Sequence, residues 1–213
     1  MTGVGRFITF EGGEGAGKST NVRMLCKAIK ALGYSVVTTR EPGGSPGAEE
    51  IRRLLVEGAT DRWDPVSEAL LHFAARRDHV EQVIRPALQR GDWVISDRFT
   101  DSTMAYQGYG HGMARESIEA LQSVTIGSLK PDLTLILDLP VELGLKRAGG
   151  RDNQETRYER MADGFHQRLR DGFLDIAARE PDRCVVIDAK RALSAVKSAI
   201  RKTVAQRLSV PLT

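Results

Sequence analysis

Cysteines and long apolar segments are scarce in this chain. The two cysteines, Cys26 and Cys184, lie far apart and form no CxxC or CxxH pair, so we expect reduced, buried, structural thiols. No apolar run approaches the roughly 20 residues needed to cross a bilayer, and the first residues lack the long apolar segment of a signal peptide. We therefore expect a cytoplasmic protein that does not enter a membrane.

A marked excess of one charge is also missing. The 31 Lys and Arg residues and 28 Asp and Glu residues leave a formal net charge of +3, which gives little support to a nucleic-acid partner. Hydrophobic residues make up 41% and charged residues 28% of the chain, as in ordinary soluble globular proteins. A length of 213 residues suits one domain, 1–213, with a full core.

Five short apolar runs, rich in β-branched residues, alternate with segments of helical spacing. The runs do not alternate strictly in polarity, which is typical of strands buried on both faces of a parallel sheet. Strands that alternate with helices predict βαβ units and a doubly wound α/β fold. One polar segment rich in both charges, 147–160, resists assignment to the core and is interpreted as an exposed flap. The predicted strands are 6–10, 35–39, 93–96, 133–137 and 184–187.

The sequence FEGGEGAGKST at 10–20 contains the phosphate-binding pattern G-x-x-x-x-G-K-[ST]. It lies between a predicted strand and an amphipathic helix, as the motif requires. Its backbone N–H groups and the following helix N-terminus are suited to phosphate oxygens. Lys18 is expected to reach the β- and γ-phosphates of ATP, and Ser19 to bind Mg²⁺. The expected ATP-binding residues are Gly12, Gly13, Glu14, Gly15, Ala16, Gly17, Lys18, Ser19 and Thr20.

The phosphate loop alone does not define the reaction. Neither of the two asparagines begins the NKxD motif of a GTPase, and no LSGGQ-like signature of a transporter ATPase is present. These absences favour a small P-loop kinase. Because ligands of open α/β sheets bind beyond the carboxyl ends of the strands, the phosphate acceptor is expected near TREPGGSPG at 39–47 and SDRFTDSTMAYQGYG at 96–110.

These segments together resemble bacterial thymidylate kinases. The resemblance rests on FEGGEGAGKST, TREPGG, SDRFTDSTMAYQG and LDLPVELGLKRA, and it runs in order from about residue 7 to 188. It implies a P-loop NTPase fold, with a five-stranded parallel sheet flanked by helices on both faces and a mobile lid. It also implies transfer of the γ-phosphoryl group of ATP to the 5′-phosphate of dTMP, giving dTDP and ADP. A homodimer is implied by the resemblance only.

The resemblance assigns roles around the transferred phosphate. Arg98 corresponds to the arginine that bridges the acceptor phosphate and the donor γ-phosphate, a task suited to a rigid guanidinium fork. Asp97 ends a predicted strand and would bind Mg²⁺ or its water. Arg40 and Glu41 correspond to an acceptor-site pair, with the acid near Mg²⁺ or the sugar. On the residues alone, the alternative for Arg98 is a surface arginine that caps a strand end. The alternative for Arg40 and Glu41 is a mixed-charge turn.

For the base, the matching segment is LLHFAARRDH at 70–79. Phe73 is expected to stack on thymine, although the apolar pattern alone makes it a core residue. Arg77 is preferred to Arg76 as the partner of a pyrimidine carbonyl because a spacing of four places it on the same helix face as Phe73. His72 and His79 are interpreted as structural or exposed.

Further acceptor contacts are expected along the segment after Arg98. Tyr106 is expected to crowd the ribose 2′ position and so favour deoxyribose. The complete predicted set is Arg40, Glu41, Pro42, Phe73, Arg77, Arg98, Ser102, Thr103, Tyr106 and Gln107.

The flap corresponds to the family's lid. Arg151 and Arg157 are expected to close on ATP, although this segment is longer and more polar than the family pattern, and a solvated surface is the alternative. Some family members carry an arginine within the phosphate loop, and others supply it from the lid; with glycines and an alanine around Glu14, this chain resembles the second kind. Glu14 is expected to face the acceptor, where it would accept a hydrogen bond from the sugar 3′-hydroxyl or a lid arginine. Its alternative is a solvent-facing loop acid.

Two other functions stay open on the sequence. A P-loop kinase could act on another small acceptor such as dUMP, a nucleoside or a sugar acid. A nucleotide-dependent switch would bind ATP without phosphoryl transfer. The preference between dTMP and dUMP is not set by these patterns.

Overall fold

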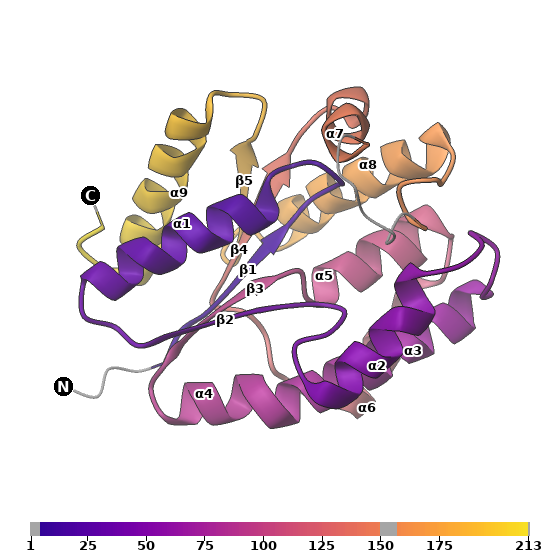
Figure 1. Cartoon of the computed structure of the whole chain (residues 1–213), viewed down its shortest axis with the longest axis horizontal. Helices are drawn as coiled ribbons and strands as arrows, with labels where there is room; N and C mark the ends of the chain where they lie inside the picture. The colour runs from indigo at the N-terminus through magenta and orange to yellow at the C-terminus, as the bar shows by residue number, and fades with distance from the viewer. Residues whose placement is uncertain (1–4, 150–156, 213) are drawn as a thin grey trace.

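The computed structural model describes residues 5–149 and 157–212. Over these residues, five parallel strands form one sheet in the order β2-β3-β1-β4-β5 (Figure 1). Each predicted strand is confirmed to within one residue, and so is the α/β fold. The strands are β1 Phe7–Glu11, β2 Val36–Arg40, β3 Trp93–Asp97, β4 Leu133–Asp138 and β5 Cys184–Asp188.

The central strands are apolar on both faces because helices cover both faces of the sheet. Every residue of β1 is buried, and in β3 and β4 only the last residue is partly exposed. The edge strands β2 and β5 keep several partly or fully exposed residues. In the register, Phe10 of β1 lies opposite Asp97 of β3 and Leu135 of β4. The carboxyl ends of β1 and β3 therefore meet at one edge, where Glu11 and Asp97 begin the loops of the site.

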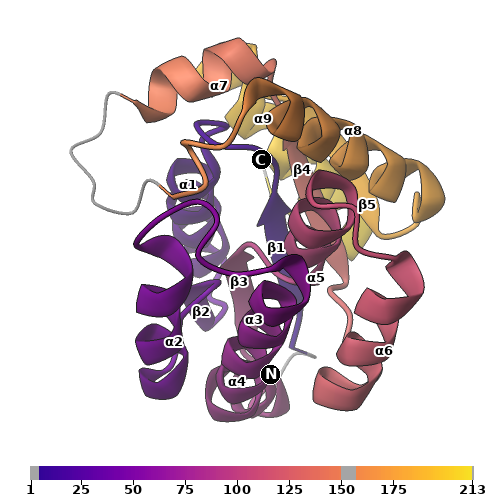
Figure 2. The ribbon, with the colours of Figure 1, turned by 90° about the vertical axis from the view of Figure 1, so that its right-hand side faces the viewer.

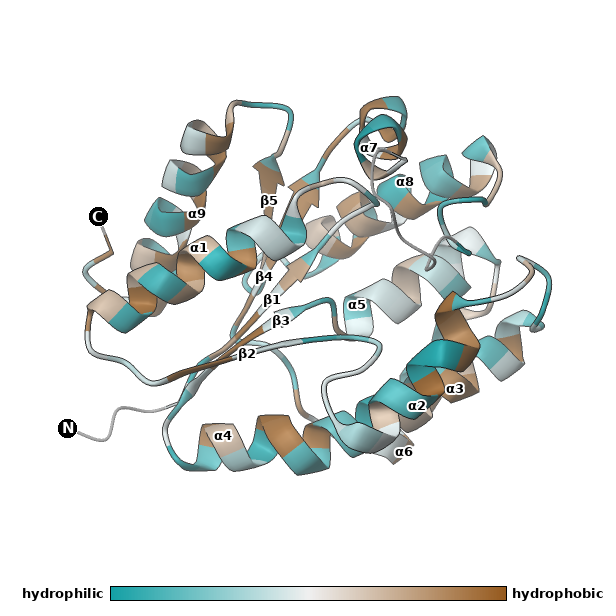
Figure 3. Ribbon diagram, in the orientation of Figure 1, coloured by the Kyte–Doolittle hydropathy of each residue, from teal (hydrophilic) through white to brown (hydrophobic). Residues whose placement is uncertain are grey.

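Two helical layers enclose this sheet (Figures 1 and 2). One core joins α1 and α9 to one face, whereas the opposite face is covered by η1 and α4 near β1 and β3, and by α8 near β4 and β5. Figure 3 shows hydrophobic residues along the strands and hydrophilic residues interspersed along the helices. The α-helices are α1 Lys18–Ala31, α2 Pro46–Val56, α3 Pro65–His79, α4 Arg85–Gln89, α5 Thr100–Thr103, α6 Arg115–Ile126, α7 Val141–Ala148, α8 Asp163–Arg179 and α9 Leu193–Leu208, and the π-helical segments are η1 Val80–Ile84 and η2 Met104–Gly110.

Local sequence signals explain the ends of the helices next to the site. Helix α1 follows Gly17, whose φ of 90° is in the left-handed region, and stops before Gly33 with φ 88°, a conformation that glycine favours at the ends of helices. Helix α3 begins where Asp64 Oδ1 accepts hydrogen bonds from the N–H groups of Val66 and Ser67. Gly17 thus marks the end of the phosphate loop, where α1 begins. The Asp64 cap fixes the first residue of α3.

The two cysteines are buried and free, as predicted. Burial raises the pKa of the Cys184 thiol to about 12, so it stays protonated. Of the helices in the described ranges, none has both the length and the apolar character required to cross a bilayer.

Candidate active site

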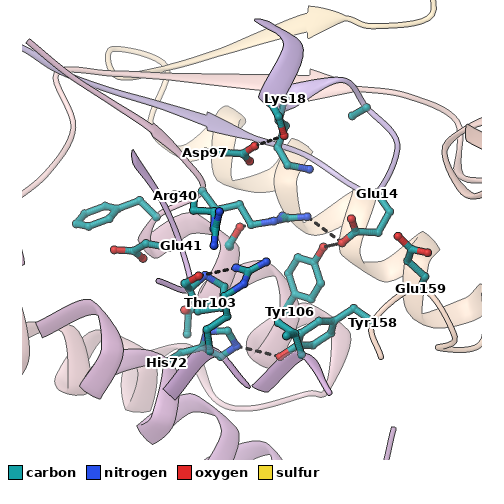
Figure 4. A pocket seen from close by; sticks show the side chains of 18 of the residues that line it. Glu14, Lys18, Arg40, Glu41, His72, Asp97, Thr103, Tyr106, Tyr158 and Glu159 are labelled. Atoms are coloured by element: carbon teal, nitrogen blue, oxygen red, sulfur yellow. Dashed lines mark hydrogen bonds and ion pairs between the residues drawn. The ribbon is translucent and has the colours of Figure 1, made fainter. Parts of the chain in front are cut away.

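A cavity of about 560 Å³ joins the phosphate loop to the predicted acceptor segments (Figure 4). It lies at the carboxyl edge of the sheet, beyond β1, β2 and β3, and this volume is typical of a small-molecule site. The structure thus brings together two groups of residues that lie in separate parts of the sequence. The predicted residues that line it are Glu14, Gly15, Ala16, Gly17, Lys18, Ser19, Thr20, Arg40, Glu41, Pro42, Asp97, Arg98, Ser102, Thr103, Tyr106 and Gln107.

The phosphate loop requires glycine at two positions where its backbone passes close to another part of the chain. Gly12 and Gly15 have φ angles of 127° and 67°, which L side chains rarely adopt. A Cβ atom at Gly12 would collide with the carbonyl oxygen of Leu137, and one at Gly15 with that of Gly144. The loop is therefore shaped by backbone packing against the β4–α7 region.

Lys18 is folded back onto the loop. Its Nζ donates to the carbonyl oxygens of Gly12 at 3.0 Å and Gly13 at 2.8 Å. Burial, followed by repulsion from Arg98, lowers the pKa of Lys18 to about 8, against the attraction of nearby carboxylates. A phosphate group bound in the loop would replace two neutral acceptors with charged oxygens.

Oxygen donors suited to Mg²⁺ lie beside the loop. The Ser19 hydroxyl donates to Asp97 Oδ2 at 2.7 Å, and both side chains line the cavity. In the part of the chain that the structure describes, no cluster of three or more His, Cys, Asp or Glu forms a metal cage. This donor set fits Mg²⁺, which binds through one or two protein oxygens while water and substrate phosphates supply the rest.

Glu41, the third predicted metal ligand, also lines the cavity but contacts other side chains. Its Oε2 accepts from Arg76 Nε at 2.7 Å, and its Oε1 lies 3.0 Å from His79 Nδ1. The His79 ring is held in turn by Thr39 Oγ1, 2.6 Å from Nε2. One carboxylate oxygen thus holds Arg76 and the other contacts His79, whereas Ser19 and Asp97 contact each other.

Glu14 contacts the predicted bridging arginine. Its Oε1 accepts from Arg98 Nη2 at 2.9 Å and from the Tyr106 hydroxyl at 2.6 Å, and Figure 4 shows Glu14 and Tyr106 pointing toward each other. Burial alone would raise the pKa of Glu14, but Arg98, Lys18 and the Tyr106 hydroxyl outweigh it and lower this pKa to about 2. Glu14 is an ionised group whose partners here are Arg98 and Tyr106.

Arg98 has an unusual backbone that a second acid supports. Its φ of 73° is left-handed although it is not glycine, a conformation that costs about 1 kcal/mol or more. Glu11 accepts from the next N–H, that of Phe99, at 2.7 Å and from the Ser102 hydroxyl at 2.6 Å. Ser102 Oγ also accepts from Arg98 Nη1 at 3.1 Å. Burial, reinforced by Asp101, raises the pKa of Glu11 to about 8.

Two residues of α3 that were predicted to contact the base, Phe73 and Arg77, are not among the residues that line the cavity. Phe73 is 1% exposed and packs in the core, and Arg77 is exposed, where it donates to the Thr125 carbonyl at 2.9 Å and pairs with Glu81. His72 and Arg76 line the cavity in their place. His72 and Arg76 have the same spacing of four as the predicted pair.

His72 also contacts the end of the predicted lid segment. Its Nε2 lies 2.9 Å from the Tyr158 hydroxyl, and Figure 4 shows the pair at one wall of the cavity. Burial, with repulsion from Arg76 and other arginines, lowers the pKa of His72 to about 3. The ring is therefore neutral at physiological pH, and His72 is a partly buried, hydrogen-bonded residue that also lines the cavity. Tyr158 and Glu159 line the same cavity, and neither was predicted.

Arg157 is not placed to close on ATP. Its side chain is fully buried and donates to the carbonyl oxygens of Ala59 at 2.9 Å, Leu55 at 3.1 Å and Thr60 at 2.9 Å. Its Nη1 also forms an ion pair with Glu68. These contacts tie the end of the predicted lid segment to α2 and the α2–α3 loop, which corrects the predicted role. Arg151 lies outside the described residues.

Comparisons with known proteins agree with this geometry. The family model described as thymidylate kinase matches residues 10–200. A thymidylate kinase of Caulobacter vibrioides is 59% identical, over 97% of this chain and 99% of its own length. One from a Bradyrhizobium strain is 53% identical, over 97% of this chain and 92% of its own.

A solved structure leads to the same group. The crystal structure of thymidylate kinase from Ehrlichia chaffeensis superposes with a TM-score of 0.76 at 36% identity, covering 94% of this chain and 98% of that one. The match therefore covers both the phosphate loop and the segments that line the cavity. The chain belongs to the thymidylate kinase family.

Proposed function

We propose that this cavity transfers the γ-phosphoryl group of ATP to the 5′-phosphate of dTMP, giving dTDP and ADP. The observation that carries the proposal is the position of Arg98 between the two halves of one cavity. Its Nη1 donates to the Gly12 carbonyl of the phosphate loop at 3.1 Å and to Ser102 of the acceptor side at 3.1 Å. Phosphate groups bound on either side would both lie within reach of this guanidinium.

The donor half consists of the phosphate loop and α1. We propose that loop N–H groups and Lys18 hold the ATP phosphates, with Lys18 leaving the Gly12 and Gly13 carbonyls as the nucleotide binds. Ser19 and Asp97 would hold Mg²⁺, which supplies charge neutralisation at the β- and γ-phosphates. The residues of this half bind and orient the donor in line with the acceptor.

The acceptor half recognises nucleotide through α3 and η2. Arg98 would bind the dTMP phosphate with Arg40 and Pro42 near the nucleotide, and Tyr106 would restrict the ribose 2′ position. The base would lie against His72 and Arg76, in place of the residues predicted one position later, with Thr103 and Gln107 beside it. Arg76 Nε and Nη2 are occupied by Glu41, Phe99 and Thr103, which leaves Nη1 as a donor for the base.

The remaining assignments complete the proposal. The attacking phosphate oxygen is already anionic, so the reaction needs positioning and exclusion of water more than a strong base. A lid at about 147–160 carrying Arg151 would exclude water, within a single domain spanning 1–213. We also propose a cytoplasmic homodimer whose ligands are nucleotides rather than nucleic acid.

The bridging role is tested with two arginine variants. Arg98→Ala should lower kcat with dTMP by at least about 100-fold, the cost of removing a group that stabilises charge in the transition state. Arg77→Ala is the matched control because Arg77 is exposed and should leave kcat unchanged. ADP release is measured across a panel of nucleoside monophosphates. Near-normal turnover of Arg98→Ala, or a wild-type preference for a ribonucleotide, would contradict the proposal.

A further inference from the structure

Glu68 is a buried acid that belongs to none of the sequence motifs. It lies on α3 and is 1% exposed. Its Oε1 accepts from Gln107 Nε2 at 2.7 Å, and its Oε2 forms the ion pair with Arg157. His111 Nε2 lies 3.8 Å from the same Oε1. One carboxylate thus joins α3, η2 and the end of the predicted lid segment.

This contact fixes which end of the Gln107 amide faces the cavity side. A carboxylate paired with arginine can only accept hydrogen bonds, so the amide must turn its NH₂ group toward Glu68. The opposite end, Gln107 Oε1, is buried and has no hydrogen-bond partner within residues 5–149 and 157–212. Gln107 lines the cavity, so its remaining polar group is an acceptor whose identity is set by Glu68.

A fixed donor lies in the same wall. Arg76 Nη1 is buried and likewise lacks a partner in the described part of the chain, while its other nitrogens are held by protein oxygens. This part of the wall therefore offers Arg76 Nη1 as a donor and Gln107 Oε1 as an acceptor. Thymine presents the complementary pair on one edge, its O4 carbonyl and its N3–H. Cytosine presents an amino group and an unprotonated N3 at these positions, which opposes both groups.

We propose that Glu68 is a positioning residue that sets selectivity for N3–H pyrimidines. It holds the Gln107 amide so that thymine or uracil is accepted and cytosine is rejected, and Arg157 pairs with its charge. This inference rests on the proposed placement of the base against Arg76 and Gln107. An amide that could turn over would offer N3 of cytosine a donor and would lose the discrimination.

The test is the ratio of kcat/KM for dTMP to that for dCMP. Glu68→Gln keeps the shape of the side chain but gives Gln107 a partner that accepts or donates, so both amide orientations become available. We expect this ratio to fall by about tenfold or more, with dCMP activity rising in absolute value. Glu119→Gln is the matched control because Glu119 is an exposed acid on α6, and it should leave the ratio unchanged.

A double variant separates positioning from a structural role. In Glu68→Gln with Gln107→Glu, the amide lies at position 68 and the carboxylate at position 107. The amide can donate to the carboxylate, and position 107 again presents an oxygen acceptor to the cavity. The ratio should return toward the wild-type value, and this variant decides the question if the single variant does not fold.

An unchanged ratio in folded Glu68→Gln would overturn the inference. So would a proportional loss of both activities with a lower Tm, or a double variant that does not regain discrimination. A wild-type enzyme inactive on dTMP would instead refute the proposed function itself, which makes the two failures distinguishable.

Discussion

Replacing Glu14 with glutamine removes the charge beside Arg98 and Tyr106 while keeping the size of the side chain. The pKa of Glu14 falls from 4.5 to about 2 on folding, and each pKa unit corresponds to about 1.4 kcal/mol. The full shift would be about 3 kcal/mol, and because the side chain is 19% exposed, we expect about 2 to 3 kcal/mol after solvent screening. Glu14→Gln should lower the free energy of unfolding at neutral pH by this amount.

The pH dependence identifies the origin of this loss. A carboxyl group whose pKa is lowered by folding contributes stability above its unfolded pKa, and this stability is lost as the pH falls toward the folded pKa. The gap between wild type and Glu14→Gln should therefore be full above about pH 5 and close as the pH approaches about 2. Urea unfolding at several pH values measures it, with Glu119→Gln as the exposed control. A gap that stays constant from neutral pH to about pH 3 would refute the electrostatic explanation.

Three further changes test other parts of the site. Phe73→Ala should lower the free energy of unfolding by about 3 to 5 kcal/mol, whereas His72→Ala should mainly raise KM for dTMP; the opposite pattern in denaturation and kinetics would restore the original register. Ser19→Ala should raise the Mg²⁺ concentration for half-maximal activity several-fold with little change in Tm, and an unaltered Mg²⁺ titration would remove Ser19 from the metal site. Arg157→Met should cost about 3 to 5 kcal/mol because it leaves Glu68 as an unpaired buried charge, and calorimetry showing an unchanged Tm would contradict this.

The strands and the phosphate loop were predictable because local sequence determines them. A strand buried on both faces must be apolar on both faces, so each apolar run marked its strand to within one residue. The loop glycines are required by positive φ angles at Gly12, Gly15 and Gly17. At Gly12 and Gly15 the close carbonyl oxygens of Leu137 and Gly144 add a tertiary requirement, but the glycines themselves already mark the loop in the sequence.

The register of α3 was not predictable from spacing alone. A separation of four fits His72 with Arg76 as well as Phe73 with Arg77, and the choice depends on which face meets the core. The apolar stripe Ala69, Phe73 and Val80 is buried, and Arg76 lies on this stripe three residues after Phe73. A charged residue at a core position of a helix was the available signal, since buried charges are rare unless paired.

The roles of Arg157 and Glu68 were beyond any local pattern. The partners of Arg157 are mainly backbone carbonyls between residues 55 and 60, and a carbonyl oxygen has no sequence signature. Glu68 meets Gln107 only after α3 and η2 pack together. The prediction that Arg157 closes on ATP rested on the resemblance of this segment to the family's lid, whereas tertiary packing buries the end of that segment.

The acid in the phosphate loop is explained by the cations around it. Lys18 rests on the carbonyls of Gly12 and Gly13, and Arg98 rests on Glu14, so each phosphate-binding cation already has an oxygen partner without nucleotide. Two buried cations without such partners would repel each other and destabilise the loop. In the proposed reaction, phosphate oxygens would replace these protein oxygens at positions that are already oriented, which would reduce the reorganisation needed for transfer. On this proposal, the role of Glu14 is to hold Arg98 at the place where the phosphate group would bind.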